Sequence, residues 1–252
     1  RYLYNKVPSF ITNKFKTTIM KQYEAVIKVM EGKGGYATIG YLNSEVLKVP
    51  DVEWKTKTPF ASIRRIVQDK RYFFKIRPGL WALLTYKDKL PPEILPAKNL
   101  PKSAQEEYNH TYYQVQLVEI GNLKGYQKFI PNQDKNKLYL GKKLCDMTTL
   151  SNIYRFGYDH ILQRAKTVDV TWFNERNMPA NFFEVDHSTP IQNSLLKFME
   201  LRDFYTHFFV VADSDRKNEF DTKLSSYLTF KPIRNRTGFI SYEEVFGMAI
   251  KL

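Results

Sequence analysis

The feature that most constrains the fold is a pair of short runs, Val168–Trp172 and Phe182–Ser188, which carry three acidic residues. The first run is apolar or β-branched except for Asp169, and turn-forming residues separate it from the second run. Side chains alternate between the two faces of a strand, so Glu184 and Asp186 share one face of the second run. The two runs therefore predict a hairpin that brings Asp169 close to Glu184 and Asp186.

Three carboxylates that converge with nothing basic between them repel one another unless they hold a divalent cation. Mg²⁺ prefers carboxylate oxygens and water, and it promotes the hydrolysis of phosphate esters. Acids are also common on the solvent face of a hairpin, so the pattern alone is a weak signal. Here, however, apolar residues flank the acids and the rest of the chain is basic. Both features favour an acidic site on central strands.

The charge balance points to a polyanionic partner. The chain has 252 residues, a net charge of +13 and an isoelectric point of about 9.5. Nucleic acid is the first candidate for so basic a protein, and an acidic membrane surface is the second. No run of about 18 apolar residues is present, so no transmembrane helix is expected, and no signal peptide is visible. The single cysteine, Cys145, excludes an internal disulfide and suits a reducing cytoplasm.

A proline-rich segment divides the chain. Four of its twelve prolines lie in residues 91–107, and proline continues neither a helix nor a central strand. We expect a linker there, between an N-terminal domain at residues 20–90 and a C-terminal domain at residues 108–252. Met20 has the character of a natural start, which makes residues 1–19 an expected N-terminal extension.

The pattern of the N-terminal domain predicts three helices followed by a β-hairpin. Apolar residues at helical spacing predict a first helix that ends at Gly32 and a second over about 39–47. Thr58-Pro59 predicts the start of a third helix that runs to about Lys70. Two apolar strands joined by a Pro-Gly turn follow at residues 72–84. This order is typical of a winged helix-turn-helix domain, whose third helix can enter the DNA major groove.

Basic residues concentrate on the elements that dock on DNA in such domains. Residues 55–89 contain ten Lys or Arg against two Asp. The residues predicted to contact DNA lie on the third helix, just after it, or on the wing: Arg64, Arg65, Lys70, Arg71, Lys75 and Arg77. The alternatives are a solvated basic helix and a winged helix that binds protein.

Two segments of this domain, Thr58–Ile63 and Phe73–Leu83, resemble the HARE-HTH winged-helix family. The resemblance covers about residues 20–86. Members of that family accompany DNA-modifying and DNA-cleaving enzymes, and the resemblance implies a module that senses DNA sequence or modification.

The C-terminal domain is predicted to be an α/β core with a mixed sheet. A helix over about 107–123 begins it and carries Glu119 within an apolar run, either as part of the acidic site or as a peripheral residue near a helix end. The elements expected after the acidic hairpin are a helix over about 190–203, a buried strand over 206–212, a helix over about 216–228, a strand over 238–241 and a final helix.

This order of elements resembles the PD-(D/E)XK nuclease superfamily, of which restriction endonucleases are the largest group. The resemblance covers about residues 108–246 and is most specific at Phe183–Thr189, which is similar to a Phe-Glu-Val-Glu-His-Ser/Thr strand in a bacterial branch of restriction-type endonucleases. Members of that branch carry Val-Asp-Val-x-Trp on the preceding strand, here Val168–Trp172, and an acid on the first helix, here Glu119. The resemblance implies a restriction-endonuclease-like mixed-sheet core behind the winged helix.

The resemblance also assigns roles to the acids. It implies that Asp169 and Glu184 coordinate Mg²⁺ and that Glu119 completes a second metal position. Asp186 joins Asp169 and Glu184 as a catalytic residue, which either accepts a proton from the attacking water or shares a metal-bound water. This assignment agrees with the chemistry, because phosphodiester hydrolysis needs an activated water and neutralisation of developing charge.

The chain departs from the superfamily at Asp186, where lysine is usual, and at Val168, where proline is usual. Lys197 on the following helix is either a replacement for the missing strand lysine or, as we expect, a solvated side chain. His187 points to the face opposite Asp186 if the strand is regular, so we expect a structural role for it.

Charge, pattern and resemblance together predict a cytoplasmic Mg²⁺-dependent DNA endonuclease of the type II restriction kind, which hydrolyses phosphodiester bonds in double-stranded DNA at specific sites. Sensitivity to base methylation stays open. Double-strand cleavage needs two active sites, so a homodimer or transient pairing on DNA is expected. The alternatives are a DNA-binding regulator with an inactive nuclease-like core, and an RNA-directed or structure-specific repair nuclease.

Overall fold

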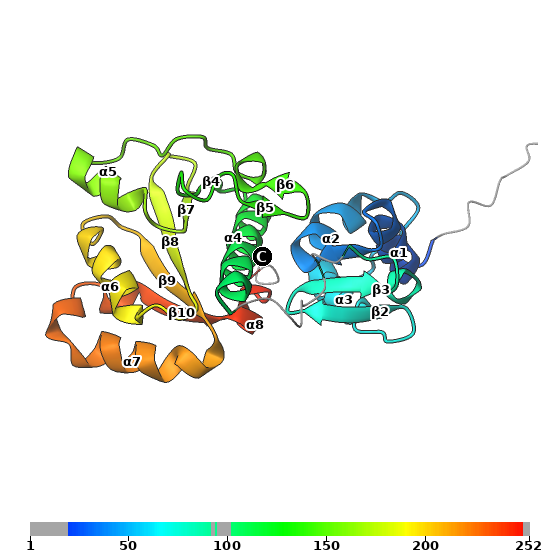
Figure 1. Ribbon diagram of the computed structural model, residues 1–252. Coiled ribbons are helices and arrows are strands. Elements are labelled where there is room, and N and C mark those ends of the chain that lie inside the picture. Colours follow the sequence, from blue (N-terminus) through cyan, green and yellow to red (C-terminus); the bar gives the residue numbers. More distant parts are fainter. Residues whose placement is uncertain (1–19, 92–93, 95–101, 249–252) are drawn as a thin grey trace, which may run out of the picture.

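The computed structural model describes residues 20–91, 94 and 102–248. Two units lie side by side, with the long helix α4 (Lys102–Leu123) of the C-terminal unit facing the N-terminal unit (Figure 1). The predicted extension at residues 1–19 and much of the predicted linker lie outside the described residues. No helix in the described ranges is long and apolar enough to cross a membrane.

The N-terminal unit contains the three predicted helices and the predicted hairpin. Its helices are α1 (Gln22–Gly32), α2 (Ile39–Glu45) and α3 (Pro59–Ile66). Its antiparallel sheet has the order β1 (Tyr36–Thr38), β3 (Leu80–Leu83), β2 (Phe73–Arg77). Strand β1 was not predicted, because three residues are too few to show a period.

Helix α3 ends at Ile66, short of the predicted end near Lys70. The carboxylate of Asp69 accepts a hydrogen bond from the backbone N–H of Arg71 at 3.0 Å. Such a local turn competes with the helical hydrogen bonds, which explains why helix-forming residues do not extend α3.

The C-terminal unit is built on a five-stranded mixed sheet, as predicted. The strand order is β10 (Thr237–Ser241), β9 (His207–Ala212), β8 (Pro179–Asp186), β7 (Val170–Phe173), β4 (Gln127–Phe129). Strands β8, β9 and β10 run parallel, whereas β7 is antiparallel to both β8 and β4. A separate small hairpin is formed by β5 (Leu138–Tyr139) and β6 (Lys142–Lys143).

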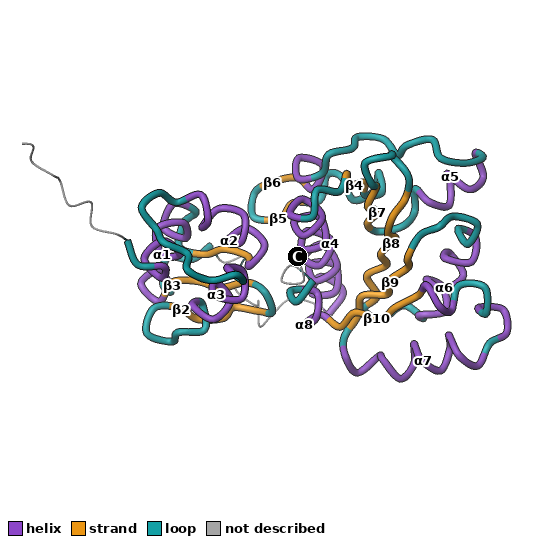
Figure 2. The backbone as a smooth tube through the Cα atoms, turned by 180° about the vertical axis from the view of Figure 1, so that it is seen from behind, coloured by secondary structure: helices purple, strands orange, loops and turns teal. Residues whose placement is uncertain are grey.

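Helices cover both faces of this sheet (Figure 2). The remaining helices are α5 (Asp159–Ala165), α6 (Ile191–Glu200), α7 (Lys217–Ser226) and the short α8 (Tyr242–Val245). Short 3-10 turns lie at Val46–Lys48, Leu84–Tyr86, Leu144–Met147, Ser214–Arg216, Leu228–Phe230 and Arg234–Arg236.

The sheet separates two hydrophobic cores. Side chains of β8 alternate between the two faces of the sheet, so successive residues of this strand point into different cores. Phe183 and Val185 pack toward α4, and Phe182 packs toward α6 and α7. The burial of large apolar side chains on both faces is the main stabilising contribution in such a layered fold. Glu184 and Asp186 share the α6 side with Phe182, as the period of two predicts.

Helix α4 begins at Lys102, inside the segment predicted to be a linker at residues 91–107. The last proline of that segment is Pro101, so nothing after it prevents a helix. The prediction that the helix starts near residue 107 was therefore wrong by about one turn. Helix α5, a single short helix, was not predicted.

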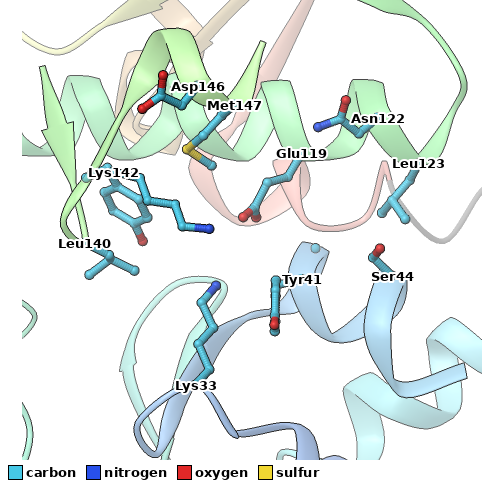
Figure 3. Close-up of a pocket in the computed structure, with 12 residues that line it drawn as sticks. Lys33, Tyr41, Ser44, Glu119, Asn122, Leu123, Leu140, Lys142, Asp146 and Met147 are labelled. Carbon is cyan, nitrogen blue, oxygen red and sulfur yellow. The ribbon is translucent and has the colours of Figure 1, made fainter. Parts of the chain in front are cut away.

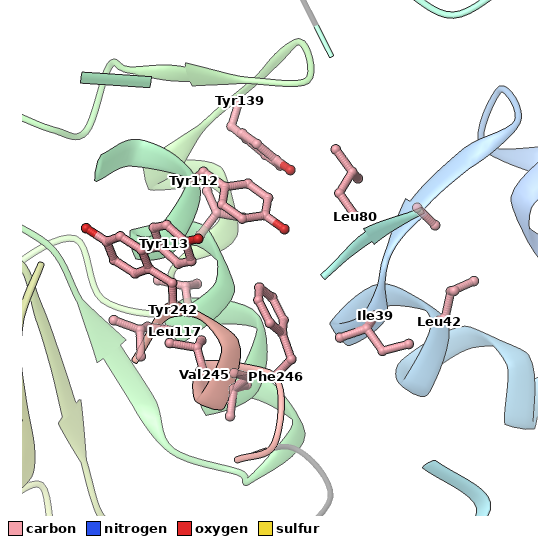
Figure 4. Close-up of a cluster of buried hydrophobic side chains, with 14 of the residues drawn as sticks. Ile39, Leu42, Leu80, Tyr112, Tyr113, Leu117, Tyr139, Tyr242, Val245 and Phe246 are labelled. Atoms are coloured by element: carbon pink, nitrogen blue, oxygen red, sulfur yellow. The ribbon is translucent and has the colours of Figure 1, made fainter. Parts of the chain in front are cut away.

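One apolar core continues from the N-terminal unit into the C-terminal unit. Ile39 and Leu80 of the first unit belong to the same buried cluster as Tyr112 and Phe246 of the second (Figure 4). Gly79 makes this approach possible: its φ of +72° suits glycine, and an added Cβ would lie 1.8 Å from the Phe246 ring. The turn of the β2–β3 hairpin is therefore packed against the C-terminal unit.

Candidate active site

The predicted acidic hairpin forms between β7 and β8. Val170 pairs with Phe183 in antiparallel register, which places Asp169, the residue just before β7, level with Glu184. The Oδ2 atom of Asp169 accepts a hydrogen bond from the backbone N–H of Val185 at 2.8 Å. This bond fixes the Asp169 carboxylate against the strand that carries the other two acids.

Glu184 lies buried and forms an ion pair with Lys197 on α6. The Lys197 Nζ atom is 2.7 Å from Oε2 and 2.9 Å from Oε1 of Glu184, and it also donates to the Thr167 carbonyl at 3.1 Å. Burial and then the negative charge of Asp169 raise the pKa of Glu184 well above its usual value, against the opposing effect of Lys197. This contact corrects our expectation of a solvated Lys197. Helix α6, which follows β8, places the Lys197 side chain against Glu184.

Asp186 is also buried, and two hydroxyl groups hold its carboxylate. Thr189 donates to Oδ1 at 2.6 Å, and Ser194 on α6 donates to Oδ2 at 2.7 Å. Burial raises the pKa of Asp186, although both hydrogen bonds act to lower it. A buried carboxylate with a raised pKa binds a proton more readily than a solvated one.

Two residues of α4 that the sequence analysis missed contact Asp169. The Nε2 atom of His110 lies 3.1 Å from Asp169 Oδ2, and Gln114 donates to the Asp169 carbonyl at 3.1 Å and to the buried Asp134 at 2.8 Å. Burial acts to lower the pKa of His110, but the hydrogen bond and charge of Asp169 outweigh it, so that pKa is raised. A signal was present: His110 and Gln114 are four positions apart, so they share one face of the helix.

His187 lies on the side of α4 and α8, away from the Asp186 carboxylate. Its Nδ1 atom is 2.5 Å from the hydroxyl oxygen of Tyr242. Burial and the neighbouring His110 lower the pKa of His187 to about 4. His187 also lines the cavity that holds the acids, so its structural role stays a prediction.

These side chains line one open cavity of about 440 Å³. Its lining includes the three acids together with Lys197, His110 and Asp134. The cavity is therefore the place where a substrate could reach all three predicted acids.

Glu119 does not join this cluster, so its predicted place as a second metal ligand is corrected. It lies nine residues after His110 on α4, or about 13 Å along the helix axis. Its Oε2 atom accepts a hydrogen bond from Thr38 of the N-terminal unit at 2.6 Å. The apolar run that surrounds Glu119 packs on the N-terminal unit as well as on the sheet, which the sequence does not reveal.

Arg77, predicted to contact DNA from the wing, points into the junction between the units. Its guanidinium lies 4.4 Å from the ring centroid of Tyr108 and donates to the Ile94 carbonyl at 3.2 Å. The predicted hairpin is present, but its turn is packed on the C-terminal unit, so Arg77 is an interface residue.

The other five predicted DNA contacts occupy different surroundings. Arg65 and Lys70 are exposed, and Arg71 is exposed but paired with Asp69 at 2.6 Å. Arg64 and Lys75 line a cleft of about 240 Å³ that Glu243 and Phe246 close from the C-terminal unit. Arg65 and Lys70, the exposed cations near the end of α3, are called the basic surface below.

The acidic cluster suits a hard divalent cation in the chemistry of its donors, because three carboxylates supply oxygen. Burial and then the charge of Asp169 raise the pKa of Glu184, and such an ion would offset both effects. Each carboxylate has a protein partner, however, and within the described residues no three His, Cys, Asp or Glu side chains are arranged to hold a metal. Asp169 and Glu184 would hold an ion only if Lys197 shared or released Glu184.

Comparison with known proteins gives two matches. The family described as the type II restriction enzyme NmeDI C-terminal domain matches residues 89–250. The type II restriction enzyme NmeDI of Neisseria meningitidis serogroup C is 27% identical over 176 residues, which cover 63% of this chain and 49% of that protein. The chain thus spans about half the length of this curated relative. No solved structure matches.

Proposed function

The chain belongs to the family of the type II restriction enzyme NmeDI C-terminal domain, and from this premise we propose that it is a Mg²⁺-dependent DNA endonuclease of the type II restriction kind. The observation that carries the proposal is the convergence of Asp169, Glu184 and Asp186 with Lys197 in one cavity. The match covers the unit that holds this cavity. The PD-(D/E)XK assignment supports the same reading through the Asp…Glu-x-Asp spacing.

In this proposal the acids have distinct tasks. Asp169 and Glu184 hold Mg²⁺, which when bound would neutralise charge on the phosphate and acidify a water. Asp186, held by Thr189 and Ser194, accepts the proton of the attacking water. Its raised pKa makes it a stronger base than a solvated aspartate.

In the PD-(D/E)XK superfamily a lysine usually stands on the strand at the position of Asp186. We propose that Lys197 supplies the positive charge of that lysine from α6 instead. From α6 it places a positive charge 2.7 Å from Glu184. That charge offsets the repulsion among the acids before substrate binds, and it can stabilise the negative charge that develops on a phosphodiester.

The N-terminal unit is proposed to be a winged helix-turn-helix that binds double-stranded DNA through α3. The order of its helices and strands and the exposed Arg65 and Lys70 support this role. Its packing on the C-terminal unit fixes the distance between the basic surface and the acidic cavity. A homodimer that presents two cavities to the two strands, and a cytoplasmic location where DNA is available, complete the proposal.

The test is to incubate the purified chain with unmethylated and methylated plasmid DNA, with and without Mg²⁺. Discrete fragments that need Mg²⁺ support the proposal, and a difference between the plasmids shows whether methylation blocks or licenses cleavage. Intact plasmid in every lane, with DNA binding equal in both conditions, would instead favour the regulator with an inactive core. Cleavage confined to flaps, mismatches or single strands would favour a repair nuclease.

A further inference from the structure

A second cavity, of about 360 Å³, lies between the two units and apart from the acidic site. Its size falls in the range of about 300–1,000 Å³ that is usual for small-molecule sites. The N-terminal unit contributes Lys33, Tyr41 and Ser44, and the C-terminal unit contributes residues of α4, the β5–β6 hairpin and the turn after it (Figure 3). The proposed nuclease chemistry uses none of these residues.

The cavity contains a buried hydroxyl group that lacks a partner. Tyr139 is 3% exposed, and its hydroxyl makes no hydrogen bond within the described part of the chain. Figure 4 shows this hydroxyl directed toward the N-terminal unit. A buried polar group without a partner destabilises a fold, so such a group at a cavity wall indicates a ligand that supplies the missing hydrogen bond.

Charged groups also face the cavity. The ammonium groups of Lys33 and Lys142 point toward the space beneath the Glu119 carboxylate (Figure 3). Among the described residues neither lysine forms an ion pair, although Lys33 lies 3.5 Å from the ring centroid of Tyr41. Two ammonium groups thus face a single carboxylate, that of Glu119, because the Asp146 carboxylate points away from this space (Figure 3). The excess of positive charge favours the binding of a ligand anion.

Glu119 is built into the wall rather than solvated. Gly40 leaves room for it, because an added Cβ would lie 2.9 Å from Glu119 Oε2. That atom accepts a hydrogen bond from Thr38, which leaves Oε1 as a further acceptor toward the cavity. Burial raises the pKa of Glu119, while burial lowers the pKa of Lys33. A ligand that donates a hydrogen bond to Oε1 would satisfy the remaining acceptor of this carboxyl group.

We propose that this cavity binds one nucleotide whose base carries an exocyclic amino group, with the phosphate between Lys33 and Lys142 and the amino group at Glu119. A carboxylate accepting from an exocyclic amine is a familiar base contact. Leu123, Leu140 and Met147 supply the apolar wall that a base needs. Inorganic phosphate alone would leave the Tyr139 hydroxyl and the Oε1 atom of Glu119 without hydrogen bonds within the described residues, so the proposal includes a base.

The nucleotide has two sources, a free mononucleotide or a nucleotide of a DNA strand swung out of its stack. Only the second source rests on the proposed function. Calorimetry on the full chain without divalent metal, using dAMP, dCMP, dTMP and inorganic phosphate, examines the first source. A parallel titration uses an all-thymidine single strand and the same strand with one internal dA or dC.

Saturable binding of dAMP or dCMP, about tenfold tighter than dTMP or phosphate, supports a free nucleotide. A similar preference seen only for the substituted strand supports a nucleotide of DNA. Tyr139→Phe and Lys142→Ala should each remove about tenfold of the preferred affinity, whereas Lys143→Ala, a neighbour outside the cavity, should not. Tyr139→Phe breaks no hydrogen bond among the residues that the structure describes, so its thermal unfolding should match the wild type.

The proposal is overturned if neither titration shows a preference for the amino-bearing base, or if both cavity variants bind as the wild type does. Asp169→Asn separates this result from the proposed function. It should abolish cleavage and leave nucleotide binding unchanged, because its side chain lies in the other cavity.

Discussion

Lys197 determines the charge balance of the acidic site, because it is the cation that contacts Glu184 directly. Its side chain is 25% exposed and that of Glu184 is 5% exposed, so solvent screens the pair only weakly. Removing one partner of such a pair leaves a buried charge without compensation.

We predict that Lys197→Met lowers the free energy of unfolding by about 3 kcal/mol at pH 8. The folded-state pKa of Glu184 is already raised, and loss of Lys197 raises it further. A carboxyl group whose pKa is higher in the folded state than in the unfolded state favours folding while it is protonated. That contribution to the free energy of unfolding is lost as the pH rises through the folded-state pKa. The defect measured by urea unfolding should therefore shrink toward about pH 5.

Lys217→Met is the matched control, since Lys217 pairs with Asp221 on the surface. Its effect should stay within about 0.5 kcal/mol at both pH values. A Lys197→Met defect of equal size at both pH values would contradict the coupling to Glu184.

Residue by residue, the acids were predictable and their surroundings were not. Asp169, Glu184 and Asp186 converge because strand alternation and a hairpin suffice to bring them together. The positions of Glu119 and Arg77 depend on how the two units pack, and no local pattern carries that information. His110 was missed because its spacing to Gln114 shows which helix face the two share, but not that this face meets Asp169.

Helix α4 is the element on which both cavities depend. His110 and Gln114 face the acidic site near its beginning, and Glu119 faces the N-terminal unit near its end. The contact with α2 runs through Thr38, whose hydroxyl caps α2 by accepting from the Tyr41 N–H at 3.1 Å and donates to Glu119.

We predict that Thr38→Val destabilises the protein by about 2–3 kcal/mol, because it removes both a helix cap and a hydrogen bond to a carboxyl group. Thr38→Ser keeps the hydroxyl and should lose less than half as much. Urea unfolding measures both variants. If Thr38→Val unfolded at the wild-type midpoint, the hydroxyl would not connect the two units.

Most elements follow from sequence period, but some boundaries do not. The mixed sheet and its helices were predicted from the spacing of their apolar residues, which has a period of 2 in strands and of 3.6 in helices. Strand β1 is too short to show a period. Helix α5 was missed because only Ile161, Leu162 and Ala165 are apolar in it. Helix α4 starts earlier than predicted because a proline-rich composition ends at Pro101, not at residue 107.

At the scale of the whole molecule, the shared core makes the basic surface and the acidic cavity parts of one body. DNA bound at the end of α3 would then extend to the acidic cavity over a fixed distance, because the two sites do not move relative to each other. Under the proposed function, DNA affinity would come from exposed cations rather than from Arg77.

We predict that reversing Arg65 and Lys70 to Glu weakens DNA binding and reduces the slope of log affinity against log salt by about 2. Arg77→Ala should lower thermal stability and leave that slope unchanged, because its guanidinium contacts Tyr108 and Ile94. Binding is measured by fluorescence anisotropy over a series of salt concentrations. An unchanged slope for the Arg65 and Lys70 variant would move DNA recognition to the C-terminal unit.

The most direct test of the account compares wild type, Asp169→Asn and Glu184→Gln for cleavage of plasmid DNA in Mg²⁺, with DNA binding measured in Ca²⁺. The account predicts that each variant loses cleavage by more than about a hundredfold and binds DNA as the wild type does. Cleavage by either variant near the wild-type rate would contradict the claim that these acids form the nuclease centre.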